Sequence, residues 1–191
     1  NGHTGFVIRW HNEENPSGFS IVLPENSPPI ISDFKSIYGV LGGSRTTIKD
    51  SFKNQHSGID FYIKKGSPIL AANDGKVLIA KKISCPGNVI VIKHWGGTPS
   101  SIYIYAIYMH IGKFKVKEGD KVKRGQLIAN AGSEVRTKCG GGIEHLHFTL
   151  STFGPCYAAH CLGTYGTYLG YSEYFTNPHN HWTGGKGKPE C

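Results

Sequence analysis

The sequence predicts a mostly β protein, an antiparallel β-sandwich or sheet with hairpin half-repeats and few short helices. Three observations support this fold class. Glycine and tyrosine are abundant, with 26 and 10 of 191 residues, whereas long amphipathic runs are few. Short runs of β-branched and aromatic residues follow one another closely. Turns rich in Gly, Asn and Asp divide these runs, and regular short strands separated by turns are typical of an antiparallel sheet.

The expected strands lie between residues 59 and 150. The run 89–92 consists of β-branched residues, the run 102–109 alternates Ile with Tyr or Ala, and the turn Asn73-Asp74-Gly75 separates two further runs. These patterns indicate strands, not helices. In chain order the predicted strands are Ile59–Ile63, Ile69–Ala72, Lys76–Ala80, Val89–Ile92, Ile102–Met109, Leu127–Ala129 and Leu146–Leu150.

Two segments within this region resemble each other weakly. Residues 66–75 read GSPILAANDG and residues 125–132 read GQLIANAG. Each segment reads as a turn, a strand of small and apolar residues, and a second turn. Half-repeats of this kind occur in β-sandwiches with pseudo-symmetric hairpins, including the biotinyl and lipoyl carriers.

The chain divides into three parts around one core, which a length of 191 residues is sufficient to form. Residues 1–35 combine turn formers with short apolar pieces and are expected to form an N-terminal arm or added hairpin. Residues 36–155 hold the predicted strands and are expected to form the core of the domain. Residues 156–191 are rich in Cys, Gly and Tyr. We expect them to be an irregular C-terminal extension that packs on the same domain.

The charge balance indicates a cationic surface. The formal net charge is +8 and the pI is about 9.2, so nucleic acid, anionic lipid and anionic cell-wall polymer are possible partners on charge alone. The basic residues are scattered and no DNA- or RNA-binding motif accompanies them, so no nucleic-acid partner is expected. No apolar run reaches the roughly 18 residues that a membrane-spanning helix requires.

The cysteines and the start of the chain suggest export. Five cysteines suit an exported protein with one or two disulfides, and the odd number leaves at least one thiol unpaired within the chain. The sequence begins at Asn1, which fits the removal or omission of an upstream piece. We therefore expect a periplasmic, cell-envelope or secreted protein.

Two histidines flank a leucine at the start of the last predicted strand. Side chains alternate between faces along a strand, so His145 and His147 are expected to point to the same side. Two imidazoles on one face can converge on one metal ion or one substrate. On its own, however, such a pair is as readily explained by exposed histidines or by histidines satisfied within a core.

Two further elements carry metal-binding or proton-transferring side chains. His56 and Asp60 lie four residues apart with Gly58 between them, and they can bend round one cation as the chain enters a strand. Both residue types bind zinc at about 2.0–2.2 Å. His110 follows the run 102–109, and counting by two places it at the end of the face that carries Tyr108. The alternative for His110 is a histidine that caps a strand near solvent.

Taken together, His-x-x-x-Asp, Tyr-Met-His and His-Leu-His, in this order within a β-rich chain, resemble the lysostaphin/LytM-type zinc metallopeptidases. The segments 65–77 and 116–126 are similar to that family's strand-turn-strand and hairpin, so the resemblance covers roughly residues 36–153. It implies a zinc-dependent peptidase with one Zn²⁺ per chain. The implied substrate is the peptide stem or cross-bridge of bacterial peptidoglycan, cut as an endopeptidase or a carboxypeptidase.

The resemblance implies a role for each of these residues. His56, Asp60 and His147 become the zinc ligands, and His110 and His145 become catalytic histidines beside the metal. Three protein ligands leave a fourth position for water, which distinguishes a catalytic zinc site from a closed structural one. The two remaining histidines can take the proton of that water or stabilise the oxyanion. Which of them is the general base stays open.

The approach to the His-Leu-His motif departs from the family's usual pattern. Family members usually have a Gly-, Ser- or Thr-rich loop and then a small residue or proline, whereas this chain has Cys139 to Glu144. Glu144 is expected to point away from His145 and to be structural, with a substrate contact as the alternative. The departure concerns substrate preference and not metal binding.

The resemblance also suggests how the cysteines pair. Secreted relatives of the staphylolysin type join cysteines at places similar to Cys85 and Cys139, which implies a bridge between them. Apart from the resemblance, Cys156 and Cys161 are expected to form a short-loop disulfide, with a second metal site as the alternative, because no further Cys or His pair with zinc-finger spacing follows. Cys191 has no assigned partner.

Two other functions remain as alternatives. A non-catalytic protein of the same fold would bind the cell wall or activate a partner hydrolase, but it is expected to have lost metal ligands that are all present here. A biotinyl or lipoyl carrier requires an exposed lysine at a tight turn, and the turn at residues 73–75 has none. His94 and the other remaining histidines are expected on the surface. Tyr103, Tyr105 and Tyr108 are expected to pack or to line the cleft.

Overall fold

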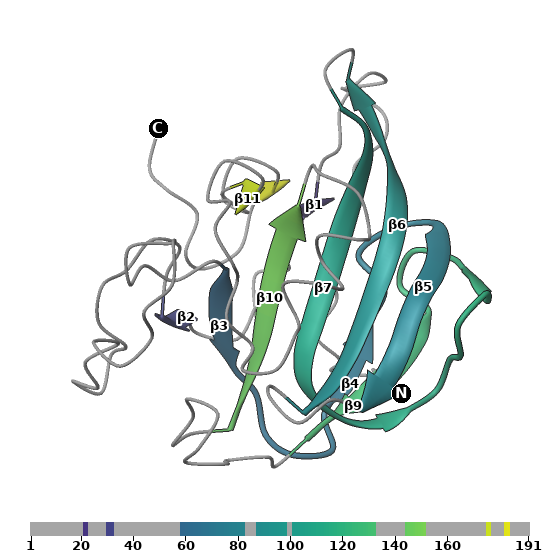
Figure 1. Cartoon of the computed structure of the whole chain (residues 1–191). Coiled ribbons are helices and arrows are strands. Elements are labelled where there is room, and N and C mark those ends of the chain that lie inside the picture. The colour runs from purple at the N-terminus through teal and green to yellow at the C-terminus, as the bar shows by residue number, and fades with distance from the viewer. Residues whose placement is uncertain are drawn as a thin grey trace, which may run out of the picture.

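The computed structural model describes residues 21–22, 30–32, 58–82, 87–98, 101–132, 144–151, 175–176 and 182–183 (Figure 1). Every regular element in these ranges is a strand, which confirms the predicted mostly β fold class. The strands are β1 (Ile21–Val22), β2 (Ile30–Ser32), β3 (Ile59–Tyr62), β4 (Pro68–Leu70), β5 (Gly75–Lys82), β6 (Asn88–Thr98), β7 (Ser101–Phe114), β8 (Lys121–Val122), β9 (Leu127–Ala131), β10 (His145–Ser151), β11 (Phe175–Thr176) and β12 (Trp182–Thr183).

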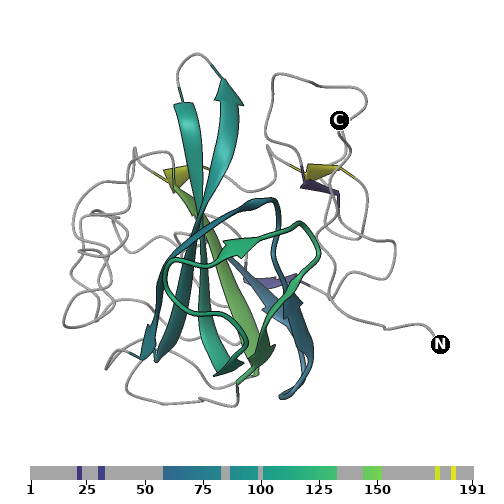
Figure 2. The ribbon, with the colours of Figure 1, turned by 90° about the vertical axis from the view of Figure 1, so that its right-hand side faces the viewer.

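The strands form one large antiparallel sheet and one small strand pair. The main path of the large sheet runs β2-β3-β10-β7-β6-β5-β8, with β11 added to β10 and with β4 and β9 joined to it through β7. Figure 1 shows β4 and β9 behind the path β3-β10-β7-β6-β5, and Figure 2 shows the same ribbon turned by 90°. β1 and β12 pair in parallel away from this sheet. Segments near both ends of the sequence therefore pair with each other or with the large sheet.

The hydrophobic core lies between the inner face of the main path and the pair β4–β9. On β10, Leu146, Phe148 and Leu150 point inward and are fully buried. They join a cluster that includes Ile69 of β4 and Ile128 of β9. This arrangement follows from strand alternation, because every second residue of each strand reaches the same side. We call this side of the sheet the core face.

Tyr108 belongs to this core face and not to a binding surface. Its hydroxyl accepts a hydrogen bond of 2.9 Å from the Ala72 backbone N–H, and its ring packs edge-on against Phe148 with centroids 5.3 Å apart. Burial raises the pKa of the Tyr108 phenol well above its ordinary value. The side chain therefore remains neutral and ties β7 to the turn after β4.

The two sequence segments that resemble each other pair as neighbouring strands. Ile69 of β4 lies opposite Ala129 of β9 in an antiparallel register. Their preceding turns also match, because Gly66 and Gly125 both have positive φ, at 83° and 74°. A side chain would be strained at these angles, whereas glycine adopts them freely. The weak sequence similarity of the two segments thus reflects two similar turn-strand units that pair with each other.

His94 differs from the expectation that it lies on the surface. It is fully buried on the core face of β6, and its Nδ1 lies 3.0 Å from the carbonyl oxygen of Asp74. Gly75 lies opposite His94 on β5, and a Cβ at position 75 would come within 2.7 Å of His94 Nδ1. The glycine therefore allows the imidazole to reach the turn carbonyl. Burial lowers the pKa of His94 to about 4.

Within the described residues, the chain forms no helix with the length and apolar character that crossing a membrane requires.

Candidate active site

The candidate site forms on the opposite face of the sheet, where β3 and β10 run side by side. Asp60 pairs with His147, and Tyr62 pairs with His145. The residues between them point to the core, so alternation places both histidines and Asp60 on one side. We call this side the site face. The expectation that His145 and His147 share a face agrees with this register.

Asp60 and His147 make the closest contact at the site. The Nδ1 atom of His147 lies 2.8 Å from Oδ1 of Asp60. His145 approaches the same oxygen with its Nε2 at 3.8 Å. Asp60 and His147 are nearly buried, with 7% and 6% of their surfaces exposed. A buried carboxylate facing imidazole nitrogen presents two of the donor types that bind zinc.

Thr149 holds the other side of the His147 ring. Its hydroxyl lies 2.6 Å from His147 Nε2, so the Nδ1 atom is left facing Asp60. The approach of Gly58 makes this packing possible, because a Cβ at position 58 would overlap Thr149 Oγ1 and the Phe148 carbonyl oxygen. The glycine between His56 and Asp60 therefore allows the chain to pass close to β10.

His110 reaches the site because β7 contains a β-bulge. On β6, Asn88 and Val89 are consecutive, but their partners on β7 are Ile111 and Met109, which leaves His110 as the extra residue. His110 has a φ of 60°, the one non-glycine residue with positive φ in the described part of the chain. A bulge of this kind redirects a side chain relative to the strand's alternation.

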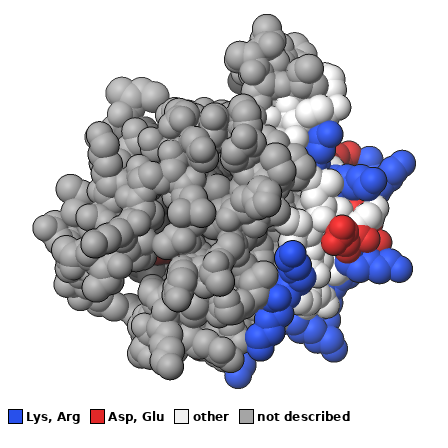
Figure 3. All heavy atoms as spheres, in the orientation of Figure 1, with Lys and Arg blue, Asp and Glu red and all other residues white. Residues whose placement is uncertain are grey.

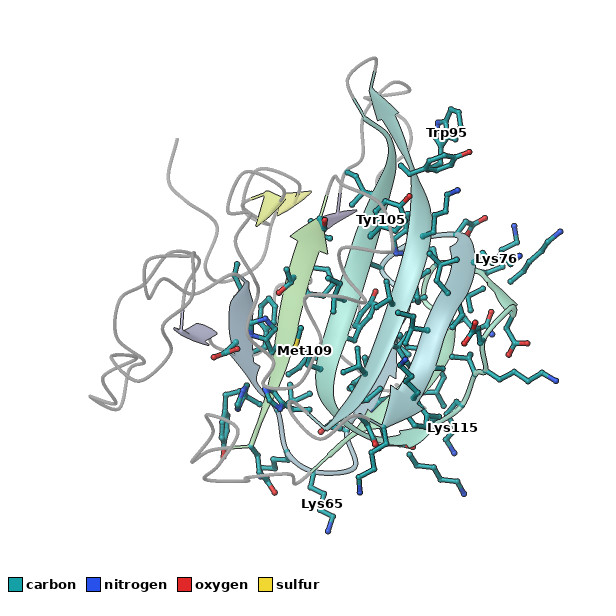
Figure 4. The ribbon with its side chains drawn as sticks, viewed as in Figure 1. Lys65, Lys76, Trp95, Tyr105, Met109 and Lys115 are labelled. Carbon is teal, nitrogen blue, oxygen red and sulfur yellow. The ribbon has the colours of Figure 1, made fainter. Side chains whose placement is uncertain are left out.

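The bulge corrects the expectation that His110 shares the face of Tyr108. The His110 ring centroid lies 4.5 Å from that of His145 and 6.3 Å from that of His147. It therefore lies on the site face, opposite to the core face that strict alternation predicts. Met109, beside it in the sequence, also lies on the site face and pairs with His147 (Figure 4).

Gly132 supports the backbone of this bulge. Its N–H donates a hydrogen bond of 3.2 Å to the carbonyl oxygen of His110. A Cβ at position 132 would lie 2.8 Å from that oxygen and 2.9 Å from the carbonyl group of Ile111. The end of β9 thus fits against the bulge only because residue 132 has no side chain.

The structure brings four of the five predicted site residues together. They are Asp60, His110, His145 and His147, whereas His56 lies outside the described residues. The candidate disulfide cysteines also lie outside them: Cys85, Cys139, Cys156 and Cys161. Among the residues that are described, no group of three or more His, Cys, Asp or Glu side chains is arranged to hold a metal ion.

Two neighbours of the site were not anticipated from the sequence. Thr149 lies two residues after His147, on the same strand face, and this spacing was the available signal. Tyr62 lies two residues after Asp60 and has the same relation to it.

Glu144 forms a hydrogen bond within the protein, because its Oε2 accepts a hydrogen bond of 3.2 Å from the Lys65 backbone N–H.

An antiparallel sheet that carries a carboxylate and three histidines on one face presents the donor types found in the class of zinc hydrolases. Comparison with known proteins specifies this class further. The family model described as Peptidase family M23 matches residues 54–157, just over half of the chain. The chain therefore belongs to peptidase family M23, which agrees with the lysostaphin/LytM-type resemblance of its motifs.

Individual relatives share the same region. The chain is 41% identical over 95 residues to the peptidoglycan DD-endopeptidase ShyB of Vibrio cholerae serotype O1, covering 50% of this chain and 20% of that protein. It is 34% identical over 105 residues to the glycyl-glycine endopeptidase ALE-1 of Staphylococcus capitis, covering 51% of this chain and 25% of that protein. The chain thus spans between a fifth and a quarter of the length of these relatives.

A solved structure gives the same result for the fold. The structure of LytU is similar with a TM-score of 0.52 and 26% identity, and the match covers 81% of this chain and 84% of that one. The antiparallel arrangement described above is therefore shared with this structure.

Proposed function

We propose that this chain is a zinc-dependent peptidase that hydrolyses peptide stems or cross-bridges of bacterial peptidoglycan. One observation carries the proposal: Asp60 and His147 face each other at 2.8 Å, with His145 and His110 beside them, in a chain that belongs to peptidase family M23. The endopeptidase relatives support the substrate class. The choice between endopeptidase and carboxypeptidase is left to experiment.

The donor set fits a zinc ion. Asp60 and His147 supply an oxygen and a nitrogen ligand, and His56, two residues before Gly58, is proposed as the third ligand. One carboxylate and two neutral imidazoles are typical of catalytic zinc sites, which keep one position open. Zinc bound by these residues supplies a Lewis acid and lowers the pKa of its bound water to about 7.

The chain's own residues then perform the remaining tasks. The buried Asp60–His147 pair fixes two ligands on neighbouring strands, and the Thr149 hydroxyl holds the His147 ring in orientation. The ring centroids of His145 and His110 lie 4.5 Å apart. Either imidazole can accept a proton from an attacking water or donate a hydrogen bond to the developing oxyanion.

The charge distribution suits an anionic polymer. Figure 3 shows lysine and arginine side chains over the described part of the surface, with few acidic ones among them. Exposed examples on β5 and β8 and in the turn after β8 are Lys76, Lys81, Lys82, Lys121, Lys123 and Arg124. A cationic surface raises the local concentration of a polyanionic substrate. A peptidoglycan substrate also places the protein in the cell envelope or outside the cell.

Two further proposals concern the regions outside the described residues. A Cys85–Cys139 bridge would close a loop of about 55 residues and contribute on the order of 4 kcal/mol to the free energy of unfolding. A Cys156–Cys161 bridge would close a short loop in the C-terminal extension. We also propose that residues 36–155 form the catalytic core, residues 1–35 an arm or added hairpin, and residues 156–191 an extension packed on the same domain. Peptide mapping under non-reducing conditions tests both bridges.

Digestion of purified peptidoglycan tests the proposed function. The wild type is expected to release new amino and carboxyl termini, which mass spectrometry identifies and which define the bond that is cut. His56→Ala and His147→Ala are expected to lose zinc. His110→Ala and His145→Ala are expected to retain zinc but to lose most activity, because they remove a proton-transferring group without removing a ligand.

Metal content and turnover together separate this proposal from its alternatives. Stoichiometric zinc without release of new termini by the wild type would instead support a non-catalytic wall-binding protein. Turnover by His145→Ala at the wild-type rate would refute the role given to His145. Zinc content of His147→Ala equal to that of the wild type would refute the ligand assignment.

A further inference from the structure

We propose that Tyr62 contacts the substrate, with its ring packing against an extended peptide that approaches His145. This inference rests on the proposed peptidase function and adds a specificity residue to it. It depends on three observations, which are the register of β3 against β10, the change in exposure along β3, and the hydrogen bond that fixes the end of this strand pair.

The pairing of β3 with β10 places Tyr62 beside His145, and His110 lies next to His145. Asp60 pairs with His147, and one step further along both strands Tyr62 pairs with His145. Cβ atoms of directly opposed residues lie about 4.5–5.5 Å apart in such a pair. His110 lies on the other side of His145. Tyr62, His145 and His110 therefore form a row across β3, β10 and β7.

Exposure rises sharply along this face of β3. Asp60 is 7% exposed and Tyr62 is 40% exposed, although the two residues are neighbours on the same side of the strand. The His145 side chain, opposite Tyr62, is only 9% exposed. Tyr62 is therefore the most open side chain beside His145 among the described residues of β3 and β10. A peptide that approaches His145 along β3 meets the Tyr62 ring first.

The backbone around Tyr62 is held in place on both sides. The Asp60–His147 contact fixes one side. On the other side, the Lys65 N–H donates to the carboxylate of Glu144, which immediately precedes His145. The ring is therefore presented from a paired strand and not from a loop. A rigid aromatic side chain loses little conformational entropy when it packs against a ligand.

Tyrosine suits an extended peptide substrate. Its ring offers an apolar surface to small side chains and to the faces of peptide groups, while the hydroxyl stays in water. The ring contact, and not the hydroxyl, is the interaction that we assign. Loss of the ring should weaken substrate binding more than it slows the chemical step. The reason is that Tyr62 lies on the site face but is not one of the proposed proton-transferring residues.

Steady-state kinetics on soluble peptidoglycan fragments test this assignment. Tyr62→Ala is expected to reduce kcat/KM about tenfold or more, mainly through KM, with unchanged zinc content. Tyr62→Phe retains the ring and is expected to stay within about threefold of the wild type. Tyr103→Ala is the matched control, because Tyr103 is similarly exposed at 37%. Tyr103 pairs with Trp95 at the other end of the sheet from Lys65 (Figure 4).

A binding measurement gives a second readout that needs no turnover. Zinc-loaded His145→Ala should be retained by insoluble peptidoglycan, and adding Tyr62→Ala to it should weaken this retention about tenfold. Unchanged KM and unchanged retention would overturn the inference, as would an equal loss in Tyr62→Phe and Tyr62→Ala. Failure of the proposed function looks different, because the wild type itself would then release no new termini.

Discussion

The hydroxyl of Thr149 can form a hydrogen bond with His147 whether the imidazole is free of metal or binds the proposed zinc ion. Without a metal, Nδ1–H can donate to Asp60, and Nε2 then accepts from the Thr149 hydroxyl, 2.6 Å away. If His147 holds the proposed zinc ion through the nitrogen that faces Asp60, its Nε2 would carry the proton and would donate to Thr149. A hydroxyl performs both tasks because it both donates and accepts. A methyl group in its place performs neither.

Replacement of Thr149 should therefore weaken metal binding. Thr149→Val keeps the shape of the side chain but leaves His147 Nε2 without the hydroxyl, and partners of this kind typically contribute 10–100-fold to metal affinity. We expect zinc affinity to fall within about that range, as measured by competition with a chelator. Thr149→Ser should restore most of the affinity. Equal affinities for the valine and serine variants would show that packing alone explains the position.

Backbone geometry at the end of β9 controls where His110 lies. Gly132→Ala would bring a Cβ within 2.9 Å of the carbonyl groups of His110 and Ile111, so the bulge must shift. We expect kcat to fall about tenfold or more while the zinc content stays at the wild-type level, because both proposed ligands on β3 and β10 are unaffected. Kinetics and metal analysis on the same preparation check this expectation.

Gly119 offers a control that separates the effect of backbone strain from the effect of displacing His110. Its φ is 90°, and a Cβ at this position would meet no other heavy atom within 4 Å. It lies in the hairpin beside β5, where its N–H donates to the Val77 carbonyl. Gly119→Ala should lower the free energy of unfolding by roughly 1 kcal/mol and leave kcat unchanged. An equal loss of kcat in both glycine variants would indicate general destabilisation.

Strand positions were largely predictable because burial leaves a period of two in the sequence. The run 102–109 is an example, since it lies entirely within β7. The bulge at His110 was not predictable, because alternation assumes regular pairing, whereas the extra residue appears only in the register between β6 and β7. The short strand β8 was also missed, because two residues carry no period.

The candidate site was predictable in part. Sequence spacing placed His145 and His147 on one face, and the register adds Asp60 to the same face. Thr149 and Tyr62 were missed because threonine and tyrosine are ordinary strand residues, and their relevance depends on which neighbours the register gives them. His94 was misplaced for a related reason, because its acceptor is a backbone carbonyl that a sequence pattern does not reveal.

The stability of the whole molecule should depend on pH through His94. Burial depresses the pKa of this residue to about 4, from an ordinary value of 6.5. Between these two values the unfolded chain binds more protons than the folded one, so the free energy of unfolding falls as the pH decreases. The contribution is fully present above pH 6.5 and is lost toward pH 4. Its slope is at most about 1.4 kcal/mol per pH unit.

Urea unfolding at several pH values between about 7.5 and 5 measures this slope. A metal chelator is added throughout, so that protonation of metal ligands does not contribute to the result. His94→Gln cannot be protonated, and its unfolding free energy should change less over this range than that of the wild type. Parallel curves for the two proteins would show that another group causes the acid sensitivity.

β7 also connects the two layers of the molecule. On one side, β7 pairs with β10 up to Met109 and with β9 from Ile111 onward, whereas β6 pairs with both Met109 and Ile111. His110 therefore lies where β7 leaves β10 and joins β9. Removing Ile111 would restore an uninterrupted ladder and put His110 in the position of Ile111, with the imidazole toward the apolar interior. The number of residues in this part of β7 is consequently as strictly determined as the identity of the histidine. Small insertions or deletions should be tolerated far less here than in the surface turns.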